Sequence, residues 1–279
     1  MTETKKLTLA HSPDSDDAFM FWALAKGYVR SDGVEFEHTL SDIQSLNQAA
    51  LEGRYDITAI SVHAYPYINQ DYALLNVGAS VGDGYGPCVV ARQKFDIDEL
   101  SGKNIAIPGS LTTAALVLRL AIPDARTEEI AFDAIMDAVA RGDVDAGVII
   151  HEGQITYKDK KLHKLIDLGE WWRDETGLPL PLGANVIRKE LDEETREKAV
   201  RAIGSSVKYA LDHRTEAIKY AQDFGRDLAQ EQVDRFVSMY VNAYTLDWGR
   251  KGHDAVRELL KRGADAGIVP EIDDIEFIG

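Results

Sequence analysis

Short apolar segments alternate with amphipathic segments along the first 150 residues. Residues 7–10, 34–38 and 57–60 have the composition of strands, and predicted helices over 16–26 and from Ser41 to Gly53 lie between them. The same alternation returns with strands at 104–107 and 146–150 and helices at 112–120 and 130–141. Strands that alternate with helices in this way predict βαβ units, an α/β fold and mainly parallel sheets.

Two sequence echoes indicate that the chain forms two similar lobes. A strand, a polar loop and a helix begin at Lys6 and again at Lys103, and a glycine turn leads into an apolar strand at Gly53 and again at Gly142. We expect crossings between the lobes near residues 82–87, which are rich in glycine, and near 181–186, after Pro179 and Pro181. The predicted lobes are residues 1–85 with 186–279 and residues 86–185, and helices are predicted over 193–212, 215–224, 231–241 and 254–262.

Polar residues follow four of the predicted strands. Ligands of open α/β sheets bind beyond the carboxyl ends of the strands, so two facing lobes would bring these four segments to one cleft. They are residues 11–16, 59–61, 109–114 and 151–154. The third segment begins a helix with small and hydroxyl residues, whose free amides can bind a carboxylate or phosphate. Taken alone, the segment favours simple capping of the helix by Thr112 over anion binding, because such residues are preferred caps.

His151 and a pair of carboxylates are the candidates for acid–base chemistry. His151 follows five apolar residues, and a neutral histidine at the tip of a buried strand suits a general base, although a structural histidine fits the same position. Asp16 and Asp17 begin a predicted helix, where acids usually interact with the helix dipole, and a catalytic role is the alternative. No spacing of histidine, cysteine and acid resembles a metal site, and no nucleophile elbow is present.

Composition narrows the classes of function. The formal charge of −16, from 31 basic and 47 acidic side chains, disfavours nucleic acid and anionic lipid as partners. No apolar run is long enough for a membrane helix, and the first residues lack the pattern of a secretory signal. With Cys88 as the one cysteine, these features predict a cytoplasmic protein whose partner is a small molecule. They make no prediction of oligomeric state.

Three segments resemble one enzyme family. The chain is similar to the 1,4-dihydroxy-6-naphthoate synthases of the futalosine route to menaquinone, in order from about Leu7 to the end. The segments that carry the resemblance are residues 149–157 (IIHEGQITY), 171–183 (WWRDETGLPLPLG) and 240–247 (YVNAYTLD).

The resemblance implies a two-lobed fold of the type II periplasmic binding proteins, used as an enzyme without metal or organic cofactor. It implies a carbon–carbon lyase that converts cyclic dehypoxanthinylfutalosine, an anionic substrate, to the naphthoate and a dehypoxanthinyl sugar. His151 matches the family's base. The implied substrate contacts are Asn47, Ala59, Ile60, Ser61, Thr112, Thr113 and Ala114.

The opening loop departs from this family. Relatives have Ser-Pro-Cys-Pro-Asn-Asp-Thr-Phe where this chain has residues 12–19 (SPDSDDAF), and Leu111 replaces a polar residue. Both loops should border the cleft, so a variant of the expected substrate is one alternative. A second alternative is the sister enzyme chorismate dehydratase. A third is a solute-binding protein without catalysis, and the missing export signal and the histidine at the cleft disfavour this third alternative.

Overall fold

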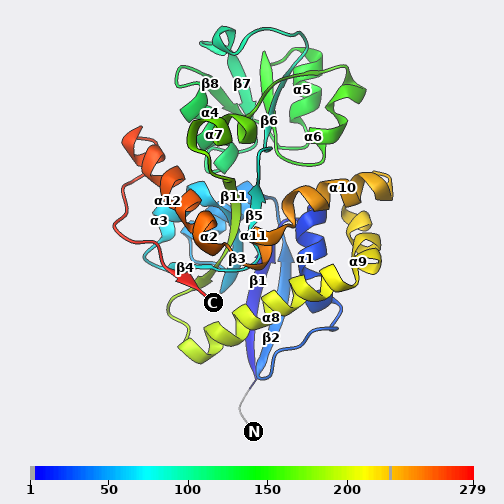
Figure 1. Ribbon diagram of the computed structural model, residues 1–279, viewed down its shortest axis with the longest axis vertical. Coiled ribbons are helices and arrows are strands. Elements are labelled where there is room, and N and C mark those ends of the chain that lie inside the picture. Colours follow the sequence, from blue (N-terminus) through cyan, green and yellow to red (C-terminus); the bar gives the residue numbers. More distant parts are fainter. Residues whose placement is uncertain (1–3, 226–227) are drawn as a thin grey trace.

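Two β-sheets form the framework of the molecule, and each lies in its own lobe (Figure 1). The computed structural model describes residues 4–225 and 228–279. The seven strands of the larger sheet are β1 (Lys5–His11), β2 (Val34–Leu40), β3 (Ile57–Ser61), β4 (Tyr72–Leu75), β5 (Ser80–Gly82), β11 (Leu180–Arg188) and β12 (Phe277–Ile278). The five strands of the smaller sheet are β6 (Cys88–Ala91), β7 (Asn104–Ile107), β8 (Arg126–Glu129), β9 (Ala146–Ile149) and β10 (His163–Asp167).

Helices cover both sheets and account for most of the remaining described chain. The α-helices are α1 (Ser15–Ala25), α2 (Ile43–Leu51), α3 (Tyr65–Ile68), α4 (Thr113–Ala121), α5 (Ile135–Arg141), α6 (Gly153–Thr156), α7 (Leu168–Thr176), α8 (Glu193–Asp212), α9 (Arg214–Ala221), α10 (Gln230–Tyr240), α11 (Ala243–Leu246) and α12 (Gly249–Asp265). The short 3₁₀ helices are η1 (Val62–Ala64), η2 (Ile97–Leu100), η3 (Tyr157–Lys160) and η4 (Gln222–Phe224).

The two sheets contain the same βαβαβ unit, as the sequence echoes predicted. In the larger sheet β1 lies between β2 and β3, parallel to both. In the smaller sheet β7 lies between β8 and β9, again parallel to both. The carboxyl ends of β1, β3, β7 and β9 are therefore equivalent positions in two copies of one unit.

Outside these units the prediction of mainly parallel sheets is wrong for every strand pair except β12 with β4, which is parallel. Strand β11 is antiparallel to β3, β4 and β5, and β6 is antiparallel to β9 and β10. The predicted second crossing, near 181–186, lies within β11, which begins at Leu180. The prolines at 179 and 181 that suggested a connection are compatible with a strand whose register shifts between Pro181 and Gly183. The boundaries of the two lobes stay a prediction.

Helix caps explain several of the helix boundaries. The side chain of Asp42, one residue after the predicted start, accepts the Ser45 amide at the beginning of α2. Thr112 likewise accepts the Ala115 amide at the beginning of α4, so the predicted capping role of Thr112 is confirmed. Gly142 ends α5 with a φ of 85°, a conformation that glycine adopts without strain.

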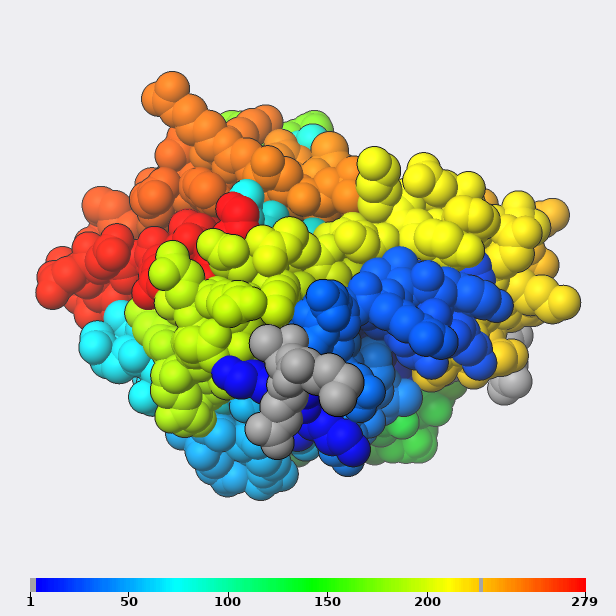
Figure 2. Space-filling view, turned by 90° about the horizontal axis from the view of Figure 1, so that it is seen from below, coloured from blue at the N-terminus to red at the C-terminus, as the bar shows by residue number. Residues whose placement is uncertain are grey.

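Helix α8 packs on the larger lobe, against α1 and the C-terminal residues. Figure 2 shows α8 in yellow-green between the N-terminal elements in blue and the C-terminal end in red. Arg196 of α8 forms an ion pair with Glu276, and Ser206 donates a hydrogen bond to the Met20 carbonyl of α1. No helix in the described part of the chain is long and apolar enough to cross a membrane.

The apolar core continues from one sheet to the other. One buried cluster contains Ile60 of β3 and Leu74 of β4 together with Val89 of β6 and Ile105 of β7. Buried polar contacts accompany it. His63 donates its backbone amide to Thr113 Oγ1 at 3.2 Å, and its Nδ1 lies 2.9 Å from the Thr112 carbonyl oxygen. Thr113 Oγ1 donates to the Leu182 carbonyl of β11 at 2.7 Å. The start of α4 is thus fixed to the larger sheet.

The buried His63 predicts a dependence of stability on pH. Burial lowers its pKa to about 4, with a further lowering by Arg119 and an opposing effect of the Thr112 hydrogen bond. In the unfolded chain the pKa is about 6.5, so between these values only the unfolded chain binds the proton and acidification favours unfolding. We expect the free energy of unfolding of the wild type, relative to His63→Gln, to fall by about 2–3 kcal/mol between pH 7 and pH 4.5.

Urea unfolding of both proteins across this pH range measures the difference. Because other titrating groups are common to both proteins, their contributions cancel. A difference in stability that does not change with pH would show that His63 does not stay neutral in the folded chain.

Candidate active site

A cavity lies between the two lobes where the strand ends converge. Three of the four predicted segments contribute to its lining, with Ser12, Asp14 and Asp16 from the first, Ala59, Ile60 and Ser61 from the second and Thr112, Thr113 and Ala114 from the third. From the fourth region Ile150, at the end of β9, lines it. The other lining residues are Asp17, Ile43, Gly78, Ser80, Pro87, Leu182, Gly183, Ala184, Asn185, Phe236 and Tyr240.

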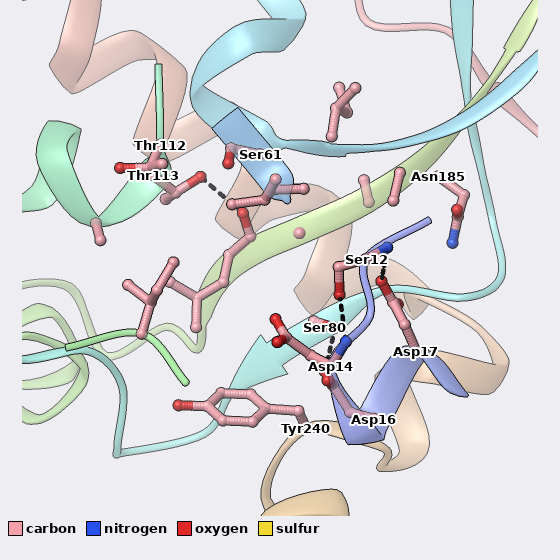
Figure 3. A pocket seen from close by; sticks show the side chains of 18 of the residues that line it. Ser12, Asp14, Asp16, Asp17, Ser61, Ser80, Thr112, Thr113, Asn185 and Tyr240 are labelled. Atoms are coloured by element: carbon pink, nitrogen blue, oxygen red, sulfur yellow. Dashed lines mark hydrogen bonds between the residues drawn. The ribbon is translucent and has the colours of Figure 1, made fainter. Parts of the chain in front are cut away.

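Hydroxyl groups and helix amides form one end of the cavity (Figure 3). Asn47, fully buried on α2, donates to Ser61 Oγ at 3.1 Å and accepts the Ser61 amide at 2.8 Å, which fixes the serine at the tip of β3. The hydroxyls of Thr112 and Thr113 donate to the carbonyls of Gly109 and Leu182. Donors for a ligand at this end are therefore the Ser61 hydroxyl and the first amides of α4, which have no intrahelical carbonyl to bind.

Carboxyl groups and acceptors form the opposite end. Figure 3 shows Ser12, Asp14, Asp16 and Ser80 together, away from Ser61 and Thr113. Ser80 Oγ donates to Asp16 Oδ2 at 3.2 Å. The first turn of α1 therefore faces the cavity, as expected for residues 11–16, although the sequence favoured a helix-dipole role of Asp16 and Asp17 over a catalytic one.

Burial changes the protonation of this end. It raises the pKa of Asp16 well above the ordinary value, and the neighbouring Asp17, Asp14 and Glu152 raise it further. Burial also raises the pKa of Asp17 to about 6, although a hydrogen bond from the Ser12 amide at 2.8 Å opposes the rise. A carboxyl kept protonated near neutral pH can donate a proton or a hydrogen bond.

His151 lies just beyond β9 and is 4% exposed, but it is not among the residues that line the cavity. Its Nδ1 accepts the Gly153 amide at 2.9 Å, and its Nε2 lies 3.1 Å from the Phe132 carbonyl oxygen. We therefore assign the proton to Nε2, which makes the ring neutral. In this conformation its basic nitrogen is bound to a backbone amide rather than presented to the cavity.

Two contacts hold the lobes together beside His151. Ser15 of α1 donates its hydroxyl to Glu152 Oε1 at 2.8 Å, and both residues are buried. Tyr240 of α10 donates to Gln154 Oε1 at 2.7 Å. These bonds bring the segment 151–154 against the larger lobe, and burial raises the pKa of Tyr240 well above its usual value, so the phenol stays protonated.

Sequence reasoning missed several of the lining residues. Ser80 and Asn185 lie on β5 and β11, and Tyr240 and Phe236 lie on α10. Tyr240 is the first residue of the 240–247 segment that carries the family resemblance, and that position was a usable signal. The sequence offers no such signal for Ser80. The buried histidines His11 and His63 do not line the cavity, and among the described residues no group of three metal-binding side chains is present.

Comparisons with known proteins agree with this architecture. The chain has 45% sequence identity to a protein of known crystal structure from Archaeoglobus fulgidus, with a TM-score of 0.91 over 95% of this chain and 98% of that one. It also superimposes on the alkanesulfonate-binding protein of Xanthomonas axonopodis pv. citri, at 13% identity and a TM-score of 0.71 over 97% and 96% of the two chains. The second likeness concerns the fold alone. The fold is that of the periplasmic binding proteins, as expected.

Sequence comparison assigns the family. The chain is 40% identical to a 1,4-dihydroxy-6-naphthoate synthase of Thermus thermophilus, over 94% of this chain and 95% of that one. It is 38% identical to the enzyme of the same name from Streptomyces coelicolor, over 95% of each. The family model described as menaquinone biosynthesis matches residues 7–265. The chain therefore belongs to the menaquinone biosynthesis family.

Proposed function

We propose that this chain is a cytoplasmic 1,4-dihydroxy-6-naphthoate synthase that cleaves cyclic dehypoxanthinylfutalosine into the naphthoate and a dehypoxanthinyl sugar. The observation that carries the proposal is the agreement of two relatives of that name across nearly the whole chain, together with a cavity at the strand ends. The reaction is a carbon–carbon lyase step. A base removes a proton from the cyclised precursor, and the electron pair of that C–H bond completes the aromatic ring. The bond to the sugar fragment breaks, and the fragment leaves with the bonding pair and takes up a proton.

His151 is the proposed base. The assigned tautomer is neutral, as a general base near pH 7 requires, and the adjacent Ile150 lines the cavity. To reach a substrate, the ring has to exchange its hydrogen bond with the Gly153 amide for the substrate proton. Gly153 suits such a movement, because a side chain there would come within 2.7 Å of the imidazole.

The substrate carboxylate is proposed to bind at the start of α4. The helix amides and the Ser61 hydroxyl supply donors, and the positive end of the helix dipole favours an anion in this acidic protein. The proposed substrate-binding residues remain Asn47, Ala59, Ile60, Ser61, Thr112, Thr113 and Ala114. Within this set, Asn47 and Thr112 contribute by positioning, since Asn47 holds Ser61 and Thr112 caps α4.

Incubation of the purified protein with cyclic dehypoxanthinylfutalosine tests the activity directly. We expect the naphthoate to accumulate over many turnovers, as followed by mass spectrometry. Saturable binding of the precursor without product would instead identify a solute-binding protein, and release of product from chorismate would indicate the dehydratase.

Replacing His151 tests the base. We expect His151→Ala to lower kcat at least about 100-fold while the protein stays folded and binds substrate, since general-base assistance typically contributes about 10²–10⁴ in rate. His151→Asn should be nearly as inactive, because it keeps polarity without basicity. Steady-state kinetics measure both variants, and His163→Ala, at an exposed position on β10, is the control. More than about a tenth of wild-type kcat in His151→Ala would rule out the base.

Replacing Ser61 tests the carboxylate end. Ser61→Ala removes a hydroxyl donor from the cavity, and a lost hydrogen bond to a charged group costs about 1–3 kcal/mol. We therefore expect the affinity for the naphthoate product, which carries the same carboxylate as the substrate, to fall roughly 5- to 150-fold. Titration calorimetry with the naphthoate measures this affinity. Ser45→Ala, at an exposed position on the neighbouring helix α2, should bind like the wild type. Equal affinities of Ser61→Ala and Ser45→Ala would contradict the proposed contact.

A further inference from the structure

The cavity differs in polarity from end to end. Around Ser61 and the start of α4 the groups that face a ligand are donors. At the other end the lining consists of Asp14, Asp16 and Asp17 with Ser80, and no lysine or arginine is present among the described lining residues. Among the described lining residues, an anion bound there would meet carboxyl groups and no cationic side chain.

Asn185 has a buried oxygen without a partner at the second end. The residue is 1% exposed on β11 and lines the cavity. Its amide nitrogen donates to the Gly78 carbonyl at 2.8 Å, which fixes the side chain, but its Oδ1 has no hydrogen-bond partner among the described residues. An unsatisfied buried acceptor is costly, and a donor on a ligand would satisfy it. Figure 3 shows Asn185 on the same side of the cavity as Asp17, away from Thr113.

The raised pKa values of the two buried aspartates favour a neutral ligand over a cation at this end of the cavity. Because burial raises the pKa of Asp16 and of Asp17, this end carries less negative charge near neutral pH than its three carboxyl groups suggest. The described residues also include no cluster of three groups placed to hold a metal ion. A protonated Asp16 carboxyl, the Ser80 hydroxyl and the Asn185 amide oxygen together donate and accept hydrogen bonds, and sugar hydroxyls do the same.

We propose that Asp16, Ser80 and Asn185 form a sugar-binding subsite, which receives the hydroxyl groups of the ligand whose carboxylate binds at Ser61 and α4. The inference rests on the proposed function for a ligand that joins an aromatic acid to a sugar. The proposed subsite sets the orientation of the ligand in the cavity, with its aromatic acid toward the smaller lobe and its sugar toward α1 and β11. Asp16 and Ser80 thereby become determinants of specificity for the sugar.

Two half-ligands test the subsite on the full-length protein. We expect 2-naphthoate and D-ribose to bind the wild type together, without competition, in ligand-observed NMR titrations. Ser80→Ala and Asn185→Leu should weaken ribose about five-fold or more and leave naphthoate within about two-fold, since each removes one hydrogen-bonding group. Ser61→Ala should do the reverse. Thermal unfolding checks the fold, and Ser80→Ala carries the test if Asn185→Leu does not fold.

The opposite pattern, competition between the two probes, or the absence of saturable ribose binding overturns the subsite. These measurements need no turnover, so they separate the two proposals. Separate binding of both probes with no cleavage of the precursor would support the subsite and reject the synthase. Cleavage of the precursor with mixed effects of the variants would support the synthase and reject the subsite.

Discussion

The hydrogen-bonded junction at the start of α4 is the contact on which the site depends. Thr113 accepts from the His63 backbone and donates to Leu182, so a single hydroxyl joins α4 of the smaller lobe to η1 and β11 of the larger one. Asn47 adds a contact to the Leu111 carbonyl at 3.3 Å while it holds Ser61. Because these groups are buried, breaking any one leaves an unsatisfied partner. The position of the helix amides relative to the tip of β3 is therefore strongly constrained.

This constraint explains why the threonines contribute little of their own chemistry. Their hydroxyl hydrogens are committed to protein carbonyls, and what remains for a ligand is the backbone of α4. Backbone amides are placed by the whole helix, whereas a hydroxyl rotates. The anion site proposed here would be preorganised, and it would be compatible with a net charge of −16 because the helix dipole acts over a short distance.

The sequence predicted those parts of the structure that depend on local pattern. Helix α8 has the predicted bounds, the two βαβαβ units follow from the echoes at Lys6 and Lys103, and the strand ends meet at one cavity. The features that the sequence did not predict depend on contacts between segments that are far apart along the chain. The antiparallel strand β11 is preceded by proline. Ser80 reaches the cavity through the pairing of β5 with β11, and Asn185 reaches it through the pairing of β11 with β3. Pairing of that kind leaves no trace in periodicity.

The hydrogen bonds of His151 bear on whether its ring can act as the proposed base. Its basic nitrogen is bound to Gly153, in a segment that two side-chain bonds, Ser15 to Glu152 and Tyr240 to Gln154, hold against the larger lobe. Both ring nitrogens of His151 thus have backbone partners, and the segment that carries the ring is bonded to α1 and α10. The proposed role as a base therefore requires that Nδ1 exchange the Gly153 amide for a substrate proton, because a nitrogen that already accepts a hydrogen bond cannot take that proton in its present orientation.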